Sequence, residues 1–202
     1  MWPGLGFFLS AVLGILSFPP VGGWPLAYIA LVPFLSASVS LSPGRAFRWA
    51  YLAGFVFYTG TLYWIGLNSG APPALTWASA VVVIAILATV WGITAWAVSH
   101  AYRRAGLRWA AGLFVILYVF FEVFWGTGEL GFPWIIWALS QTTFLPAIQT
   151  ADLADVYGIS VWVLSLNALL FLLWKRALPR RAGWIIAVVF VVPLLYGAVR
   201  LR

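Results

Sequence analysis

The sequence predicts an all-α integral membrane protein, built as a bundle of about seven transmembrane helices. First, 64% of its 202 residues are hydrophobic, only 7% are charged and the mean hydropathy is +1.04, which excludes a soluble domain. Second, prolines, glycines and charge clusters divide the chain into seven hydrophobic runs. Third, most basic residues fall in alternate breaks between these runs. Each crossing uses about 20 residues, so seven helices leave almost nothing for an extramembrane domain. We therefore expect residues 1–202 to form a single transmembrane domain.

In order along the chain, we expect helices at about 4–18, 24–41, 46–67, 75–99, 109–125, 157–174 and 183–199. The first run would be about 22 Å long at a rise of 1.5 Å per residue, short for a hydrocarbon core of about 30 Å. The second run contains Pro33, so we expect the first two helices to form a short hairpin that is tilted or kinked. Met1-Trp2-Pro3-Gly4 lacks the basic stretch of a secretory signal, so we keep it as mature structure.

Residues 126–156 interrupt the hydrophobic pattern between the fifth and sixth helices, and we expect an irregular segment on the outer face there. The segment contains the turn Gly131-Phe132-Pro133-Trp134. Proline fixes the backbone of this turn, and tryptophan tolerates both lipid tails and headgroups. The stretch from residue 122 to residue 160 also holds all four acidic residues, Glu122, Glu129, Asp152 and Asp155.

The basic residues predict the orientation of the chain. Nine of the eleven fall in the loops that follow the second, fourth and sixth helices: Arg45, Arg48, Arg103, Arg104, Arg108, Lys175, Arg176, Arg180 and Arg181. Cytoplasmic loops of membrane proteins are enriched in Lys and Arg, so we expect a cytoplasmic N-terminus. Arg200 and Arg202 lie beyond the last span and are expected on the outer side. The basic residues form no stripe with polar contacts, which argues against nucleic acid as a partner.

The composition also limits the chemistry of the chain. It has no cysteine and one histidine, so we expect no disulfide, no thiolate nucleophile, no metal site and no cofactor. His100 and Lys175 are predicted on the opposite side of the membrane from the four carboxylates, so we assign no catalytic residue. We expect those carboxylates to lack a basic partner and to meet loop backbone or cationic headgroups instead. Asn167, in mid-span, is expected to form an interhelical hydrogen bond rather than a ligand contact.

Several short motifs together resemble one bacterial family. They are Leu16-Ser17-Phe18-Pro19-Pro20, Trp24-Pro25-Leu26, Gly60-Thr61-Leu62-Tyr63-Trp64, Glu122, Gly131-Phe132-Pro133-Trp134, Ser140-Gln141, Val156-Tyr157-Gly158-Ile159-Ser160 and Asn167-Ala168-Leu169-Leu170. In this order they resemble the membrane domain of apolipoprotein N-acyltransferase, from about residue 10 to residue 176. The turn Gly-Phe-Pro-Trp, followed by Ser-Gln and then Tyr-Gly-x-Ser, is the most specific part of the match.

This resemblance implies a multi-pass enzyme of the bacterial plasma (inner) membrane. The enzyme would transfer an acyl chain from a phospholipid to the N-terminal amine of a lipoprotein. In that family the reaction belongs to a nitrilase-like domain on the outer face, which follows the seventh span and uses a Glu-Lys-Cys triad. The present chain reaches Arg202, where that domain would begin, and has none of the three catalytic positions. It also departs from the family at Trp125, where an Arg is common.

Two hypotheses follow. In the first, the chain supports acyl transfer with a separate nitrilase-like catalytic polypeptide. In the second, it is a non-catalytic scaffold or lipid-binding module that partners another envelope enzyme, such as a polyprenol-phosphate mannose synthase. Under the first hypothesis, substrate and lipid contacts are expected from Phe132, Pro133, Trp134, Gln141, Tyr157, Glu122 and Trp64. The competing interpretation of the Gly131–Trp134 turn is that it only caps the bundle.

Overall fold

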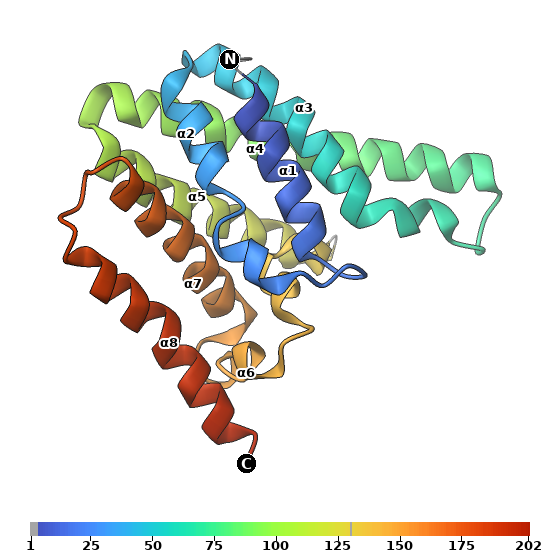
Figure 1. Cartoon of the computed structure of the whole chain (residues 1–202). Coiled ribbons are helices and arrows are strands. Elements are labelled where there is room, and N and C mark those ends of the chain that lie inside the picture. The colour runs from blue at the N-terminus through green and yellow to red at the C-terminus, as the bar shows by residue number, and fades with distance from the viewer. Residues whose placement is uncertain (1–3, 130) are drawn as a thin grey trace.

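The chain forms a bundle of α-helices, with short 3-10 helical turns in the connections that follow α1, α3 and α5 (Figure 1). The computed structural model describes residues 4–129 and 131–202. Within these ranges all regular structure is helical, which confirms the predicted all-α membrane fold. Met1, Trp2 and Pro3, which we expect in the mature chain, lie outside the described residues.

Five helices are long and apolar enough to cross a membrane. They are α3 (Pro43–Leu62, continued by the 3-10 turn η2, Tyr63–Leu67), α4 (Pro73–Ala105), α5 (Leu107–Gly126), α7 (Ala151–Trp174) and α8 (Ala182–Arg200). Two shorter apolar segments precede them, α1 (Leu5–Ser17) and the stretch from Trp24 to Ser40. The first two segments are therefore shorter than the rest, as their length and Pro33 lead us to expect.

The second segment is a broken helix. A 3-10 turn, η1 (Trp24–Tyr28), is followed by α2 (Val32–Ser40), whose first turn contains Pro33. Asn167 of α7 lies against the break: its Oδ1 accepts a hydrogen bond from the Leu31 amide at 2.8 Å, and its Nδ2 donates to the Ala27 carbonyl at 2.8 Å. Because an unpaired backbone group is costly inside a membrane, these bonds make the break possible. They confirm the interhelical role expected of Asn167.

Aromatic side chains fill the centre of the bundle. Phe57 of α3 stacks on Trp91 of α4 and on Trp137, with ring centroids 5.1 Å and 5.7 Å apart. Gly54 allows the close approach of α3 and α4, because a Cβ atom there would lie 2.8 Å from the Cβ of Trp91. Phe34 of α2 meets the same indole edge-on at 5.3 Å. The core thus joins α2, α3 and α4 to the segment that holds Trp137.

The segment between α5 and α7 is folded into one end of the bundle and does not lie only on its outer surface. It contains the 3-10 turns η3 (Pro133–Ile135) and η4 (Trp137–Gln141) and the short helix α6 (Leu145–Ile148). Trp137, Ser140 and Gln141 are completely buried. The α7 helix that follows is interrupted at Ala154 and Asp155, where the backbone dihedrals are not helical.

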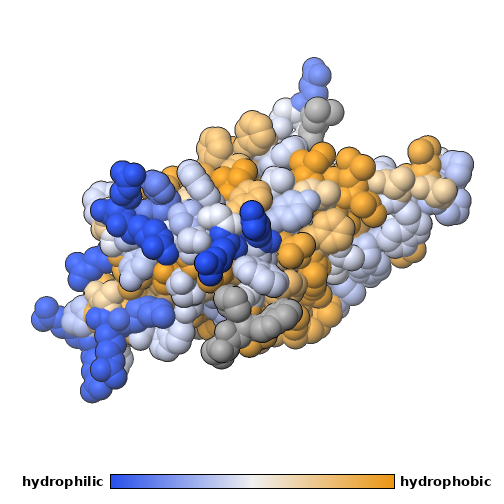
Figure 2. All heavy atoms as spheres, turned by 90° about the horizontal axis from the view of Figure 1, so that it is seen from above, coloured by the Kyte–Doolittle hydropathy of each residue, from blue (hydrophilic) through white to orange (hydrophobic). Residues whose placement is uncertain are grey.

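The charged residues lie at opposite ends of the bundle. The nine basic residues discussed above lie in or next to the turns from α2 to α3, α4 to α5 and α7 to α8, whereas α5 ends and α7 begins near the acidic ones. We call these the basic end and the acidic end. Figure 2, which views Figure 1 from above, shows hydrophilic side chains gathered toward the left, where the turns from α4 to α5 and from α7 to α8 lie in Figure 1.

One expectation about the acidic end is wrong. Asp152 does have a basic partner, because Arg200 of α8 lies 3.0 Å from its Oδ2 and the Tyr196 hydroxyl donates to the same carboxylate at 2.8 Å. Arg200 was expected on the same side as the carboxylates but not as a partner of one of them. The α8 helix packs so that its last turn brings Arg200 to Asp152.

Candidate functional site

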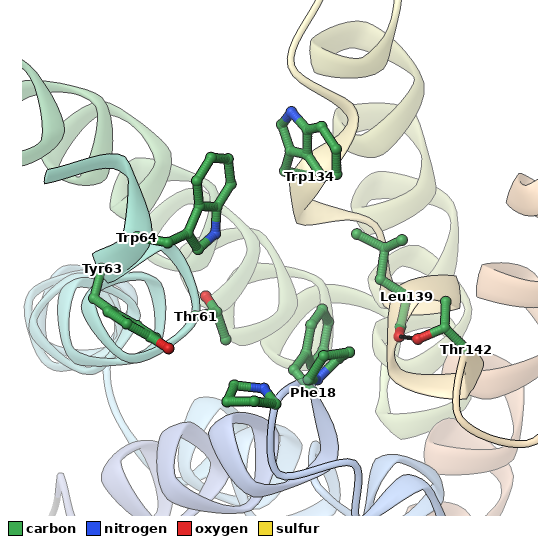
Figure 3. Close-up of a pocket in the computed structure, with 9 residues that line it drawn as sticks. Phe18, Thr61, Tyr63, Trp64, Trp134, Leu139 and Thr142 are labelled. Carbon is green, nitrogen blue, oxygen red and sulfur yellow. Dashed lines mark hydrogen bonds between the residues drawn. The ribbon is translucent and has the colours of Figure 1, made fainter. Parts of the chain in front are cut away.

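A cavity of about 460 Å³ opens at the acidic end of the bundle (Figure 3). Three segments that are distant in the sequence converge on it: the turn after α1, the junction of α3 with η2, and the stretch from residue 134 to residue 142. Its walls are mainly apolar. The lining residues are Phe18, Pro19, Pro20, Thr61, Tyr63, Trp64, Trp134, Leu139 and Thr142. We call this cavity the aromatic pocket.

Trp64 and Trp134 form an edge-to-face pair at the opening of the pocket. Their ring centroids are 5.5 Å apart and the rings are inclined by 74°. Trp64 is 42% exposed and Trp134 is 53% exposed, so part of each indole ring is free of protein contacts (Figure 3). Pro133 begins the turn that holds Trp134. An exposed pair of indoles at a helix end suits the headgroup layer, where one part of the ring meets tails and another meets water.

Three packed aromatic rings form the floor of the pocket. Phe18, which follows α1, packs edge-on against Phe57 and Trp137, in both cases with ring centroids 5.5 Å apart. Phe57 and Trp137 are themselves stacked within 6° of parallel. All three rings are nearly or completely buried, so they form a densely packed floor.

Glu122 anchors the inner wall of this region. Its carboxyl group is buried near the end of α5, and its Oε1 accepts a hydrogen bond from the Trp137 amide at 2.8 Å. Ser160 of α7 accepts a hydrogen bond from the next amide, that of Ala138, at 3.0 Å. Two backbone donors at the start of η4 are thus satisfied by side chains from two different helices. This fixes η4 in the bundle interior, where unpaired amides would be strongly destabilising.

Gln141 also ties the segment to the bundle. Its Oε1 accepts a hydrogen bond from the Tyr28 hydroxyl at 2.8 Å, and its Nε2 donates to the Ser140 hydroxyl at 2.9 Å and to the Trp24 carbonyl at 3.4 Å. The side chain is completely buried. Gln141 therefore joins η4 to η1 and does not line the aromatic pocket.

Phe132 and Tyr157 lie near the end of α5, away from the pocket lining. The Phe132 amide donates to the Trp125 carbonyl at 2.5 Å, which turns the chain back after α5. Gly126 leaves room for the Tyr157 hydroxyl, because a Cβ atom at residue 126 would collide with it. Of the seven predicted site residues, the structure thus brings Trp64 and Trp134 together in the pocket. Glu122, Pro133 and Gln141 hold the segment that carries Trp134.

Below the pocket, six buried polar atoms have no hydrogen-bond partner within the described residues. They are the hydroxyls of Tyr58, Thr94 and Tyr118, the indole nitrogens of Trp91 and Trp137, and Oε2 of Glu122. Sequence reasoning named only Glu122 of this group as a candidate site residue, because the other five residues lie in four different segments and look like ordinary core residues. Among the described residues, no three His, Cys, Asp or Glu side chains are placed to hold a metal ion.

Sequence reasoning also missed most of the pocket lining, although a signal was present. Phe18, Pro19 and Pro20 belong to one of the motifs quoted above, and Thr61, Tyr63 and Trp64 belong to another. Trp134 belongs to a third. Three of the motifs that carry the family resemblance therefore meet in space at the aromatic pocket, although Phe18 and Trp134 are 116 positions apart in the chain.

The family model described as the apolipoprotein N-acyltransferase N-terminal domain matches residues 10–169. The chain belongs to this family. The expected resemblance is thus confirmed, and the five helices long enough to cross a membrane make the chain a multi-pass membrane domain of the family.

Several relatives are named apolipoprotein N-acyltransferase. The one from Geobacter metallireducens is 33% identical over 203 residues, a match that covers 96% of this chain and 39% of the relative. The relative from Chlorobaculum tepidum is 28% identical over 95% of this chain and 37% of its own length, and the one from Pasteurella multocida is 25% identical over 93% and 36%. The chain therefore spans somewhat more than a third of the length of these apolipoprotein N-acyltransferases.

Proposed function

We propose that this chain is the membrane half of an apolipoprotein N-acyltransferase system in a bacterial plasma membrane. It supports the transfer of an acyl chain from a phospholipid to the N-terminal amine of a lipoprotein. The single observation that carries this proposal is the convergence of three family motifs on one aromatic pocket. Motifs that meet in space at an exposed cavity are better explained by a shared ligand than by packing alone.

In this proposal the aromatic pocket holds the donor phospholipid near its ester bonds. Trp64 and Trp134 contact the region between headgroup and tails, where indoles are most favourable. The apolar floor at Phe18 accepts the first part of an acyl chain. Glu122, Pro133 and Gln141 are positioning residues that keep Trp134 at the opening, and Phe132 and Tyr157 brace the end of α5 behind it.

The cysteine nucleophile that the family resemblance implies would come from outside these 202 residues, because they contain no cysteine. We propose that a nitrilase-like polypeptide with its own Glu, Lys and Cys docks at the acidic end, which then faces the outer side of the membrane. The N-terminus is cytoplasmic in this orientation. The positions of the nine basic residues at the other end support it, because such residues are retained on the cytoplasmic side.

Co-expression provides the test. The chain is produced with and without a nitrilase-like polypeptide in membranes that lack endogenous N-acylation, and the N-terminal acylation of a reporter lipoprotein is measured by mass spectrometry. We expect acylation only when both are present. Acylation by the chain alone would contradict the assignment of the nucleophile to a partner. A stable complex of the two without acylation would favour the non-catalytic scaffold.

A further inference from the structure

A second and larger cavity lies at the basic end. It is a groove of about 810 Å³ between α1 and α2, bounded by the end of α7. Leu5 and Leu9 of α1 form one side, Val32 and Leu41 form the other, and the indole of Trp174 closes the end. The two helices meet closely at Gly6, where a Cβ atom would lie 2.8 Å from the Pro33 carbonyl oxygen, so the groove is a fixed feature of their contact.

Two cations are attached to residues that line this groove. The Arg103 guanidinium donates from Nη2 to the Leu41 carbonyl at 3.1 Å. The Lys175 ammonium lies 4.6 Å from the centroid of the Trp174 ring, a cation–π contact. Both side chains are exposed at the end of the bundle. The apolar groove therefore has a positively charged rim where α4 and α7 end.

The protein itself does not neutralise this rim. All four carboxylates of the chain lie at residues 122, 129, 152 and 155, close to the acidic end. The one ion pair found within the described part of the chain, between Asp152 and Arg200, is also at that end. Figure 2 shows hydrophilic side chains gathered toward the basic end of the molecule, next to apolar surface. The counter-anion must therefore be external.

We propose that this groove binds an anionic phospholipid. One acyl chain lies between α1 and α2 against Leu9 and Val32, and the phosphate lies beside Arg103 and Lys175. A zwitterionic phospholipid would fill the groove equally well but would gain less at the rim, since each Lys or Arg near a membrane surface attracts anionic headgroups. The site is separate from the aromatic pocket and does not depend on the proposed acyl transfer. The bound lipid anchors the two short helices in the leaflet that faces the basic end.

Native mass spectrometry of the whole chain, released from vesicles of equal parts phosphatidylglycerol and phosphatidylcholine, tests this proposal. We expect one retained phosphatidylglycerol, with a preference over phosphatidylcholine on the order of tenfold. The double variant Arg103→Gln/Lys175→Gln should abolish most of this preference. The matched control Arg104→Gln/Arg181→Gln removes the same charge from the same end and should change the preference by less than about twofold.

A third variant tests the groove itself. Ser36→Phe places a ring in the groove and leaves every charge in place, so it should lower the retained phosphatidylglycerol several-fold. Circular dichroism of each variant shows whether the helices remain intact. No preference for phosphatidylglycerol in the original chain would overturn the proposal. So would an equal loss in the two double variants, or full retention by Ser36→Phe.

Discussion

The two ends of the bundle are built on different principles. At the acidic end, a segment of the chain is folded inward and held by buried hydrogen bonds that Glu122, Ser160 and Gln141 accept, which leaves a pocket walled by aromatic rings. At the basic end, a groove lies open between two short helices and is bordered by exposed cations. Shape and rigid aromatics therefore define the first region, whereas charge defines the second. Substitutions at the two ends should therefore have different effects.

The largest expected effect on stability is at Glu122. Glu122→Ala leaves the Trp137 amide without an acceptor in the bundle interior and opens a cavity. We expect a loss of about 2–4 kcal/mol in the free energy of unfolding. Thermal unfolding in detergent micelles measures it.

Glu122→Gln is the control for this variant, because the amide oxygen can still accept from the Trp137 amide. It should lose less than half as much stability as the alanine variant. Equal losses would mean that the hydrogen bond to Trp137 does not anchor η4.

Asn167→Leu should have the next largest effect. The substitution keeps the side-chain size but removes the partners of the Leu31 amide and the Ala27 carbonyl at the break in the second helix. Interhelical hydrogen bonds in membranes average about 0.6 kcal/mol each, and unpaired backbone groups add to the loss, so we expect about 1–3 kcal/mol in total. Hydrogen exchange should become faster at residues 27–31. Unchanged exchange there would contradict the role of Asn167.

At the basic end the effects on stability should be small. The Arg108 guanidinium donates to the Ala177 carbonyl at 2.9 Å, but it does so from an exposed position. Arg108→Gln should therefore change the free energy of unfolding by less than about 1 kcal/mol. Thermal unfolding of this variant beside Glu122→Ala compares the two ends directly. A larger loss in Arg108→Gln than in Glu122→Ala would reverse the comparison.

Much of the fold could be predicted from hydrophobic runs and charge. Five long helices and two short apolar segments follow from composition and from residues such as Pro33, because lipid tolerates only helices with satisfied backbone groups. The inward folding of residues 133–141 could not be predicted in this way. Its two anchors join side chains to backbone amides, at Trp137 and Ala138, and such bonds leave no pattern in a sequence.

The site was predicted in part. Trp64 and Trp134 were named because they belong to family motifs, and the structure brings them together. Gln141 was named for the same reason, but it is buried against Tyr28. A motif shows that a residue matters without showing whether it contacts a ligand or supports a neighbour. Phe18 was not named as a site residue, because a phenylalanine after a hydrophobic helix resembles ordinary core until its partners are known.

Replacement of two tryptophan pairs tests the central claim most directly, that the aromatic pocket presents the donor lipid. Trp64→Ala/Trp134→Ala removes the pair at the pocket. Trp109→Ala/Trp184→Ala removes two indoles at the basic end that are 72% and 80% exposed. N-acylation of the reporter lipoprotein is measured for both in the reconstituted two-component system. We predict at least a tenfold loss of rate for the first pair, equivalent to about 1.4 kcal/mol, and less than a twofold loss for the second. Equal rates for the two variants would contradict the account.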